Sequence, residues 1–324
     1  MKRFVISVII FALLCILGYL AYLFIWGAIP KTREQDFALR DSKFTYRPKS
    51  SFVHLMLREA NEFKDMDILF VGSSHAYGGF DVRVFEKYGF RTFVLSIAGL
   101  SPTVAQELLN RYIGSLNPKL VIYEISPERF SNSSSAAEVL IYNDDLNIQS
   151  LKMALRMNRI EVYNALLYRS MRELLKLDSN MLQPPRVKEN RDGPRSTYIS
   201  GYIEMNANTH FNSAEKKYQK TKINLSPRQL NTFKEIISGF NDRKIKYILV
   251  FTPFSKVYYN HYENIDEFDS LMRQYGEYYN FNKILNLSDS CFRDATHLLP
   301  AGAEIFSAKV AGLIDSLGII SRPD

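Results

Sequence analysis

The chain has 324 residues, of which 46% are hydrophobic and 23% are charged. This composition excludes an intrinsically disordered protein and supplies enough apolar material for a full core. The net charge of +7 suits ordinary solubility, and it also suits contact with an anionic membrane or polymer.

The first element is an uncharged apolar run from Phe4 to Trp26, which is 23 residues long. At about 1.5 Å per residue, a helix of this length crosses a hydrocarbon core of roughly 30 Å. We therefore predict an uncleaved transmembrane anchor over residues 1–30. A cleaved signal peptide is the alternative interpretation, although its apolar stretch is usually shorter.

Charges on either side of this run predict its orientation. Lys2 and Arg3 favour a cytoplasmic N-terminus, whereas Lys31 and Arg33 on the far side weaken that preference. We expect a single-pass membrane protein whose N-terminal helix contacts lipid. The larger part of the chain is then expected to lie outside the cytoplasm.

After a polar spacer over residues 31–50, the region 51–324 alternates between strand and helix patterns. Alternation of this kind predicts an α/β domain with a parallel sheet and helices on both faces. The spacing predicts strands over 67–71, 91–95, 120–125, 246–251 and 283–287, and helices over 51–64, 81–88, 102–116, 226–240, 265–279 and 300–317.

Residues from about 131 to 225 interrupt that rhythm. The stretch 151–177 is helical in pattern and rich in arginine, and residues 184–196 are rich in proline, glycine and charge. We interpret the region as an insertion that covers or shapes a site. The arginines are typical of a solvated helix face, and we expect no nucleic-acid partner.

A turn that contains serine follows the first predicted strand. The strand leads directly into Gly72-Ser73-Ser74, and His75 comes next. In an open parallel sheet, ligands bind at the carboxyl ends of the strands, where a helix start offers backbone N–H groups to an anion. By itself the tripeptide also suits a common turn. His75 is interpreted first as a cap of that turn, with a substrate contact as the alternative.

A second candidate motif lies near the C-terminus, where Asp294 and His297 precede a helix led by Pro300. A hydroxyl becomes an effective nucleophile when an imidazole accepts its proton and a carboxylate orients that imidazole. Ser74, His297 and Asp294 supply these three groups. Taken alone, the late motif also suits a local turn with a surface histidine.

Together the two motifs resemble the SGNH hydrolase superfamily, also called GDSL-type esterases. Gly72-Ser73-Ser74 stands where that family has Gly-Asp-Ser, and the late Asp-x-x-His pair precedes the last helix. The resemblance covers residues 65–125 and 245–317. It implies a three-layer α/β/α flavodoxin-like fold with a five-stranded parallel sheet in the order 2-1-3-4-5. It also implies that Ser74 is the nucleophile, His297 the base and Asp294 its partner.

The resemblance further implies an oxyanion hole in which Gly99 and Ser74 lend backbone N–H groups. The family's third block, Gly-x-Asn-Asp, is absent, and Glu124 and Ser126 stand in its place. An ionised glutamate cannot donate a hydrogen bond, whereas the Ser126 hydroxyl is a further candidate donor. Loss of one oxyanion donor costs about 10²–10³ in rate. Ser73, which replaces the family's aspartate, leaves open which of the two serines attacks.

The loop, the anchor and the extracytoplasmic domain resemble two groups of bacterial envelope proteins. These are the membrane-anchored D-alanyl transfer protein of teichoic acid modification and the SGNH-like proteins of alginate O-acetylation. The resemblance implies a serine-dependent acyl-ester hydrolase or O-acyltransferase that acts on cell-envelope glycans through an acyl-serine intermediate. Its substrate would be an acylated glycan or an acyl donor, and its partner a membrane-bound O-acyltransferase.

Two other functions stay open at this point. The missing asparagine block fits a catalytically inactive SGNH-fold scaffold, and the insertion fits a glycan-binding subunit of a membrane acylation complex. The aromatic stretch 258–262 suits either a carbohydrate groove or the core. Metal-ligand spacings and phosphate- or dinucleotide-binding motifs are absent from the sequence, so we expect neither a metal nor a cofactor.

Overall fold

The computed structural model describes residues 1–28, 51–131, 133–177, 197–207 and 210–320. These residues belong to two compact units. The helical unit comprises the N-terminal helix and residues 137–177, and the α/β unit comprises the remaining described residues. The predicted spacer over 31–50 and the segment 184–196 lie outside the described residues.

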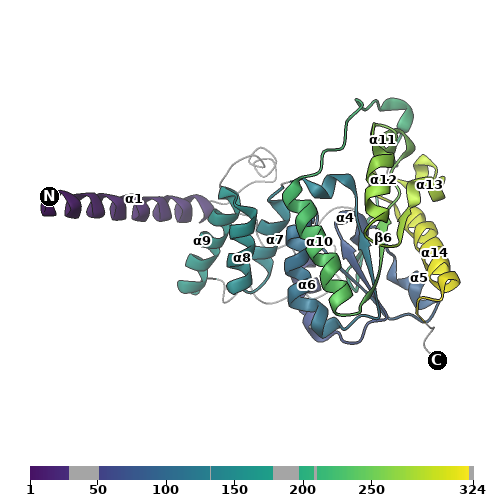
Figure 1. Ribbon diagram of the computed structural model, residues 1–324, viewed down its shortest axis with the longest axis horizontal. Coiled ribbons are helices and arrows are strands. Elements are labelled where there is room, and N and C mark those ends of the chain that lie inside the picture. The colour runs from purple at the N-terminus through teal and green to yellow at the C-terminus, as the bar shows by residue number, and fades with distance from the viewer. Residues whose placement is uncertain (29–50, 132, 178–196, 208–209, 321–324) are drawn as a thin grey trace. The chain divides into compact units, whose positions relative to one another are not determined.

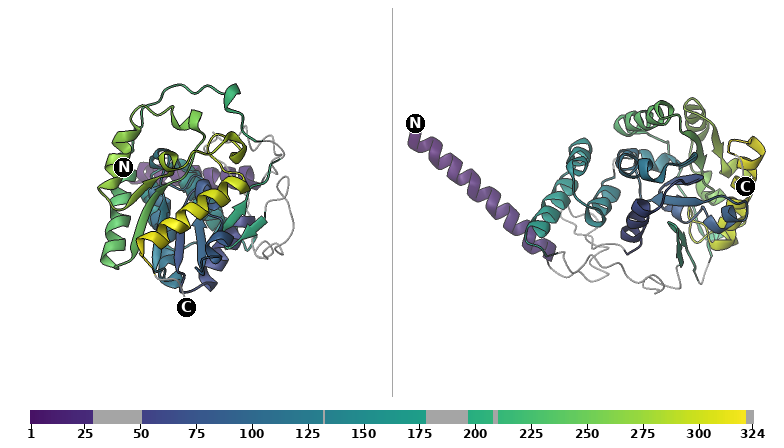
Figure 2. Two further views of the ribbon diagram at one scale, coloured as in Figure 1. Left: turned by 90° about the vertical axis from the view of Figure 1, so that its right-hand side faces the viewer. Right: turned by 90° about the horizontal axis from the view of Figure 1, so that it is seen from below.

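A parallel sheet of five strands forms the centre of the α/β unit (Figures 1 and 2). Its order is β2-β1-β3-β6-β7, and every neighbouring pair runs parallel. This confirms the predicted α/β class, the number of strands and their order. The strands are β1 (Ile68–Gly72), β2 (Thr92–Ser96), β3 (Leu120–Glu124), β6 (Lys246–Phe251) and β7 (Tyr278–Asn280), and a separate hairpin pairs β4 (Thr197–Ile199) with β5 (Tyr202–Glu204).

Helices cover both faces of the sheet, which explains why β1, β2 and β3 are buried along their whole length. α3, α6 and α10 pack together on one face, and α5 and α14 pack together on the other. The helices of this unit are α3 (Ser51–Glu62), α4 (Ser74–Tyr77), α5 (Val82–Glu86), α6 (Pro102–Leu116), α10 (Pro227–Asp242), α11 (Lys256–Tyr259), α12 (Ile265–Arg273), α13 (Phe281–Ile284) and α14 (Pro300–Leu317).

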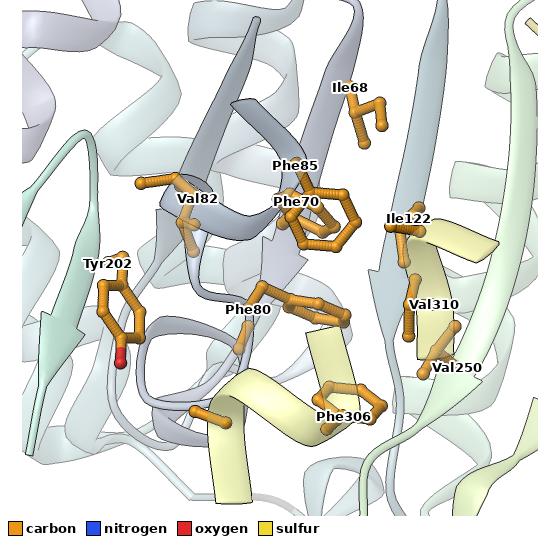
Figure 3. Packing of buried hydrophobic residues seen from close by; sticks show 14 of the residues in the cluster. Ile68, Phe70, Phe80, Val82, Phe85, Ile122, Tyr202, Val250, Phe306 and Val310 are labelled. Carbon is orange, nitrogen blue, oxygen red and sulfur yellow. The ribbon is translucent and has the colours of Figure 1, made fainter. Parts of the chain in front are cut away.

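Alternate residues of the strands fill the core on the side of α5 and α14 (Figure 3). The ring of Phe70 from β1 stacks on Phe80 with 4.3 Å between ring centroids, and Phe80 lies 5.1 Å from Phe306 of α14. Residues of the other parity face α6 and α10, as Tyr123 does beside Phe233. Because β1 and β3 are packed on both sides, their carboxyl ends are held in place.

The fifth strand was predicted in the wrong place. Residues 265–279 were expected to be one helix and 283–287 a strand, yet α12 ends earlier and β7 lies within the expected helix. Gly276 has a φ of 151°, a conformation that favours glycine and does not continue a helix. Asn280 in β7 then donates to the buried Asp269 of α12 at 2.9 Å, which ties the strand to the helix before it.

The helical unit also departs from its prediction, because the pattern over 151–177 forms two helices. α8 (Ile148–Met157) and α9 (Ile160–Leu174) are separated at Asn158, whose φ of 47° lies in the left-handed region that asparagine tolerates. The unit further contains α1 (Lys2–Ala28) and most of α7 (Ser135–Asn143).

Among the described residues, α1 is the helix that is long and apolar enough to cross a membrane. By length and composition it suits a membrane anchor or a signal sequence. The orientation of the chain, its location and the predicted boundaries of anchor and domain at 1–30 and 51–324 stay predictions.

Candidate active site

The fold brings Ser74, His297 and Asp294 together within the α/β unit. The Ser74 Oγ lies 2.8 Å from Nε2 of His297. Nδ1 of the same ring lies 2.8 and 3.0 Å from the two carboxylate oxygens of Asp294. These distances suit transfer of the hydroxyl proton to the ring and orientation of the ring by the carboxylate.

Ser74 lies at the carboxyl edge of the sheet, where the ends of β1 and β3 are in close contact. Gly72 is the last residue of β1, and a Cβ atom there would lie 2.6 Å from the Cβ of Glu124 and 2.8 Å from that of Ala76. A side chain here would force its neighbours to shift, which favours glycine at this position. The chain then turns at Ser73, whose Oγ accepts the His75 N–H at 3.3 Å and caps α4. Ser74 is thus the first residue of a helix.

The Asp294 carboxylate organises the loop that carries His297. Its Oδ1 accepts the backbone N–H groups of Thr296 and His297, each at 3.0 Å. Burial opposes ionisation of Asp294, but the hydrogen bond from His297 and the nearby Arg293 hold its pKa well below the usual range. Burial lowers the pKa of the His297 imidazole, and Asp294 partly opposes that shift. At neutral pH the carboxylate is therefore charged and the ring is neutral, as a general base requires.

Glu124, at the end of β3, fixes the turn at Ser73 through hydrogen bonds. Its Oε2 accepts the backbone N–H of Ser73 at 2.8 Å and the Ser73 hydroxyl at 2.9 Å. Oε1 lies 3.6 Å from Nδ1 of His75. Burial opposes ionisation, yet His75, the Ser73 N–H and Arg129 hold the Glu124 pKa below its usual range. Glu124 is thus an ionised acceptor that fixes the serine turn and donates no hydrogen bond.

The two predicted backbone donors, Ser74 and Gly99, follow the neighbouring strands β1 and β2. Ser74 begins α4, and Gly99 lies in the loop after β2 with a φ of 72° that favours glycine. Neither N–H donates to another described residue. Ser126 is fully buried, and its hydroxyl has no hydrogen-bond partner among the described residues, Ser74 included. Its role as a further oxyanion donor stays a prediction.

His75 and Ser73 are both buried. The His75 ring packs between Phe254, at 4.8 Å, and His297, at 4.9 Å between centroids. Their burial favours the interpretation of His75 as part of the turn over a role in contacting substrate. It also favours Ser74, which is partly exposed, over Ser73 as the attacking serine.

An open cleft of about 550 Å³ adjoins the Asp294 side of this arrangement. Its wall includes Phe211, Tyr218, Tyr258, Glu128 and Arg293. The Glu128 carboxylate accepts hydrogen bonds from the hydroxyls of Tyr258 at 2.5 Å and Tyr262 at 3.0 Å. The cleft contacts Asp294 and Thr296 but not Ser74 or His297, so it lies beside the reacting atoms.

Reasoning from the sequence missed the anchoring role of Glu124 and the carboxylate of Glu128. Both carboxylates contact residues that are distant in sequence, Ser73 for Glu124 and Tyr258 for Glu128, so no local pattern marks them. The aromatic stretch 258–262 was the available signal. Tyr258 lines the cleft while Tyr262 is buried, and the carbohydrate groove stays a prediction.

Within the described part of the chain, no group of three or more His, Cys, Asp or Glu side chains could hold a metal ion.

Comparison of the sequence with known protein families and curated proteins found no relative. No protein-family model matches the chain, and no curated protein sequence matches it.

Solved structures do match, although distantly. A crystal structure described as "a putative acylhydrolase" from Bacteroides fragilis NCTC 9343 is 10% identical with a TM-score of 0.42, and the match covers 84% of this chain and 99% of that one. A structure described as "a gut microbial diltiazem-metabolizing enzyme" is 15% identical with a TM-score of 0.27, covering 77% of this chain and 48% of that one. At these scores neither likeness carries a functional argument.

Proposed function

We propose that this protein is a serine-dependent acyl-ester hydrolase or O-acyltransferase that acts through an acyl-Ser74 intermediate. The observation that carries the proposal is the continuous hydrogen-bonded line from the Ser74 Oγ through both nitrogens of His297 to Asp294. A hydroxyl, a neutral imidazole and an ionised carboxylate in this order form the arrangement that activates a serine.

In the first half of the reaction, the Ser74 Oγ attacks the carbonyl carbon of an acyl ester while His297 Nε2 takes the hydroxyl proton. Asp294 stabilises the imidazolium that forms. The backbone N–H groups of Ser74 and Gly99 donate to the oxyanion of the tetrahedral intermediate. Collapse of that intermediate breaks the ester C–O bond, and the leaving oxygen takes the proton back from His297.

In the second half, water or a sugar hydroxyl attacks the acyl-Ser74 carbonyl. His297 takes the proton of the attacking group and returns it to the Ser74 oxygen as the acyl group leaves. Water as the acceptor makes the protein a hydrolase, and a sugar hydroxyl makes it a transferase. Glu124 takes no proton in this scheme, because its carboxylate is already engaged by Ser73.

The proposed substrates are acylated cell-envelope glycans or their acyl donors. The aromatic wall of the cleft, with Tyr218 and Tyr258, and the carboxylate of Glu128 suit the faces and hydroxyls of a sugar. A membrane anchor at α1 would tether such a site to the membrane, where a membrane-bound O-acyltransferase could supply acyl groups. The proposed location is the extracytoplasmic side of a bacterial envelope.

The test is labelling of the full chain in detergent with a fluorophosphonate probe, read by intact mass. Wild type is expected to gain one label, and Ser74→Ala and His297→Ala none. Ser73→Ala is the matched control, because its hydroxyl is buried beside the same turn. That variant is expected to retain labelling at Ser74, although more slowly because a contact to Glu124 is lost.

Absence of labelling in folded wild type would contradict the proposal and favour the inactive scaffold. Labelling that follows Ser73 would assign the nucleophile to the other serine. Once labelling is established, release of an acyl group to water or to an added oligosaccharide distinguishes hydrolase from transferase.

A further inference from the structure

Exposed aliphatic side chains concentrate in the helical unit, even apart from α1. Outside α1, the described residues expose eleven large hydrophobic side chains, and eight of them lie between residues 148 and 177. On α8 and α9 they are Ile148, Leu151, Leu155, Ile160, Leu167 and Leu174. An exposed apolar concentration of this kind marks an interaction surface.

These side chains follow helical spacing. Ile160, Leu167 and Leu174 recur every seven residues and therefore lie on one face of α9. The opposite side of α9 is buried, including Val162 and Ala165. α8 repeats the arrangement, with Ile148, Leu151 and Leu155 on an exposed stripe and Met153, Ala154 and Met157 buried. We refer to the two exposed stripes as the α8–α9 apolar face.

The end of the predicted membrane span packs against α9. Leu23 of α1 is buried, the Phe24 ring lies 6.0 Å from that of Tyr168, and the Tyr19 hydroxyl donates to Asn164. The earlier part of α1 is exposed to its surroundings. α9 lies across the C-terminal end of α1 and not along its length (Figures 1 and 2). If α1 spans a bilayer, α9 is therefore at the level of the bilayer surface.

The net positive charge of α8 and α9 suits contact with anionic lipid headgroups at the bilayer surface. Residues 148–177 contain six basic and two acidic side chains, and Lys152, Arg156, Arg159 and Lys176 are exposed. Two aspartates, Asp144 and Asp145, precede α8 and reduce this excess. Exposed aliphatic residues flanked by lysine and arginine are the composition of helices that lie in the interface of an anionic membrane.

We infer that the α8–α9 apolar face lies in the surface of the bilayer that α1 enters, with its basic side chains at anionic lipid headgroups. This inference goes beyond the acyl chemistry and does not depend on it. It rests on insertion of α1. The helical unit would then hold the chain to the membrane at two places, one across the bilayer and one along its surface.

The test uses the full chain reconstituted in vesicles of phosphatidylcholine and phosphatidylglycerol. Trp26 is the single tryptophan of the chain, so a Trp26→Phe background permits one-tryptophan variants. Leu167→Trp reports on the α8–α9 apolar face. Ile305→Trp on α14 is the matched control, because Ile305 and Leu167 are exposed to similar extents, 47% and 40%. Leu17→Trp reports on the span. Quenching by brominated lipid and by aqueous acrylamide is measured for each.

We expect brominated lipid to quench Leu167→Trp almost as strongly as Leu17→Trp and severalfold more than Ile305→Trp. Adding Arg156→Gln and Arg159→Gln should lower the ratio of docked to undocked protein about fivefold for each charge removed, from about 1 kcal/mol per basic side chain near an anionic surface. Acrylamide quenching of Leu167→Trp like that of Ile305→Trp would overturn the inference. Protection of Leu167→Trp from both quenchers would overturn the inference in favour of a protein contact. Lack of lipid quenching at Leu17→Trp would overturn it as well, because α1 would then not be inserted in the bilayer.

Discussion

The α/β unit and the helical unit place their apolar side chains in opposite ways. In the α/β unit, the large hydrophobic residues that are exposed among those described are Ile284 at the end of α13 and, twelve residues apart on α14, Ile305 and Leu317. In the helical unit they form stripes on α8 and α9 in addition to α1. The first unit has a closed core of its own, and the second leaves apolar surface for another environment to cover.

This contrast separates chemistry from attachment. Every residue assigned to the proposed reaction lies in the α/β unit, where packing on both faces of the sheet holds Ser74 and His297 in place. Residues inferred to meet lipid lie in the helical unit. Substitutions in one unit should therefore leave the property of the other unchanged, and the following predictions use that independence.

The largest effect is expected from Ser74→Ala. Removal of the proposed nucleophile should lower the turnover of a soluble aryl ester by about 10⁴-fold or more, because the proposed reaction needs the serine, the imidazole and the carboxylate together. The same variant should show unchanged lipid quenching in the Leu167→Trp background. Conversely, Leu167→Ser should leave turnover within twofold of wild type. A loss of ester turnover in Leu167→Ser would break the proposed separation of the two units.

Asp294→Asn should lower kcat by about 10²–10⁴, because an amide neither stabilises the imidazolium nor selects the required tautomer of His297. Steady-state kinetics across pH check this. In wild type, turnover should fall as pH falls through the His297 pKa, since the protonated ring cannot act as a base. Burial lowers that pKa, so the acidic limb should lie below the ordinary histidine value of about 6.5. An acidic limb above that value would contradict the assigned environment.

Glu124→Gln should lower the free energy of unfolding by about 1–3 kcal/mol, because hydrogen bonds to a buried charged group are replaced by weaker ones. Turnover should fall about tenfold as the serine turn loosens. Glu304→Gln is the control on the same unit. Its side chain is exposed and its contact with Lys87 is long, 3.8 Å, so a change near zero is expected. Chemical denaturation and ester kinetics check both variants.

Gly72→Ala should lower the free energy of unfolding by about 1–3 kcal/mol, since the added methyl would lie 2.6 Å from the Cβ of Glu124. Gly239→Ala, within α10, is the matched control. A Cβ atom there meets nothing within 4 Å, so stability should rise by about 0.4–1 kcal/mol. Equal effects at the two positions, measured by denaturant melts, would show that the strand ends are not packed as tightly as described.

Much of the architecture follows from local sequence. A buried strand such as Ile68–Gly72 is recognisable as a short apolar run, and an amphipathic helix such as Pro102–Leu116 by the spacing of its apolar residues. The prediction failed at the fifth strand, because three residues are too few for a periodic signal. β7 exists through pairing with β6 and through the contact between Asn280 and Asp269. It also failed at Asn158, where one backbone conformation divides a continuous helical pattern.

For the candidate site, the sequence alone supplied Ser74, His297 and Asp294 as chemically suitable groups in motifs of recognisable order, and their catalytic roles stay predictions. Only the tertiary structure showed that the Ser74 hydroxyl and the His297 ring, 223 residues apart in sequence, lie 2.8 Å apart. Only it showed that Glu124, from the neighbouring strand, accepts the backbone N–H of Ser73. The physical reason is that hydrogen bonds and burial depend on distance in space. Periodicity records which face of an element is apolar, but not which distant group that face will meet.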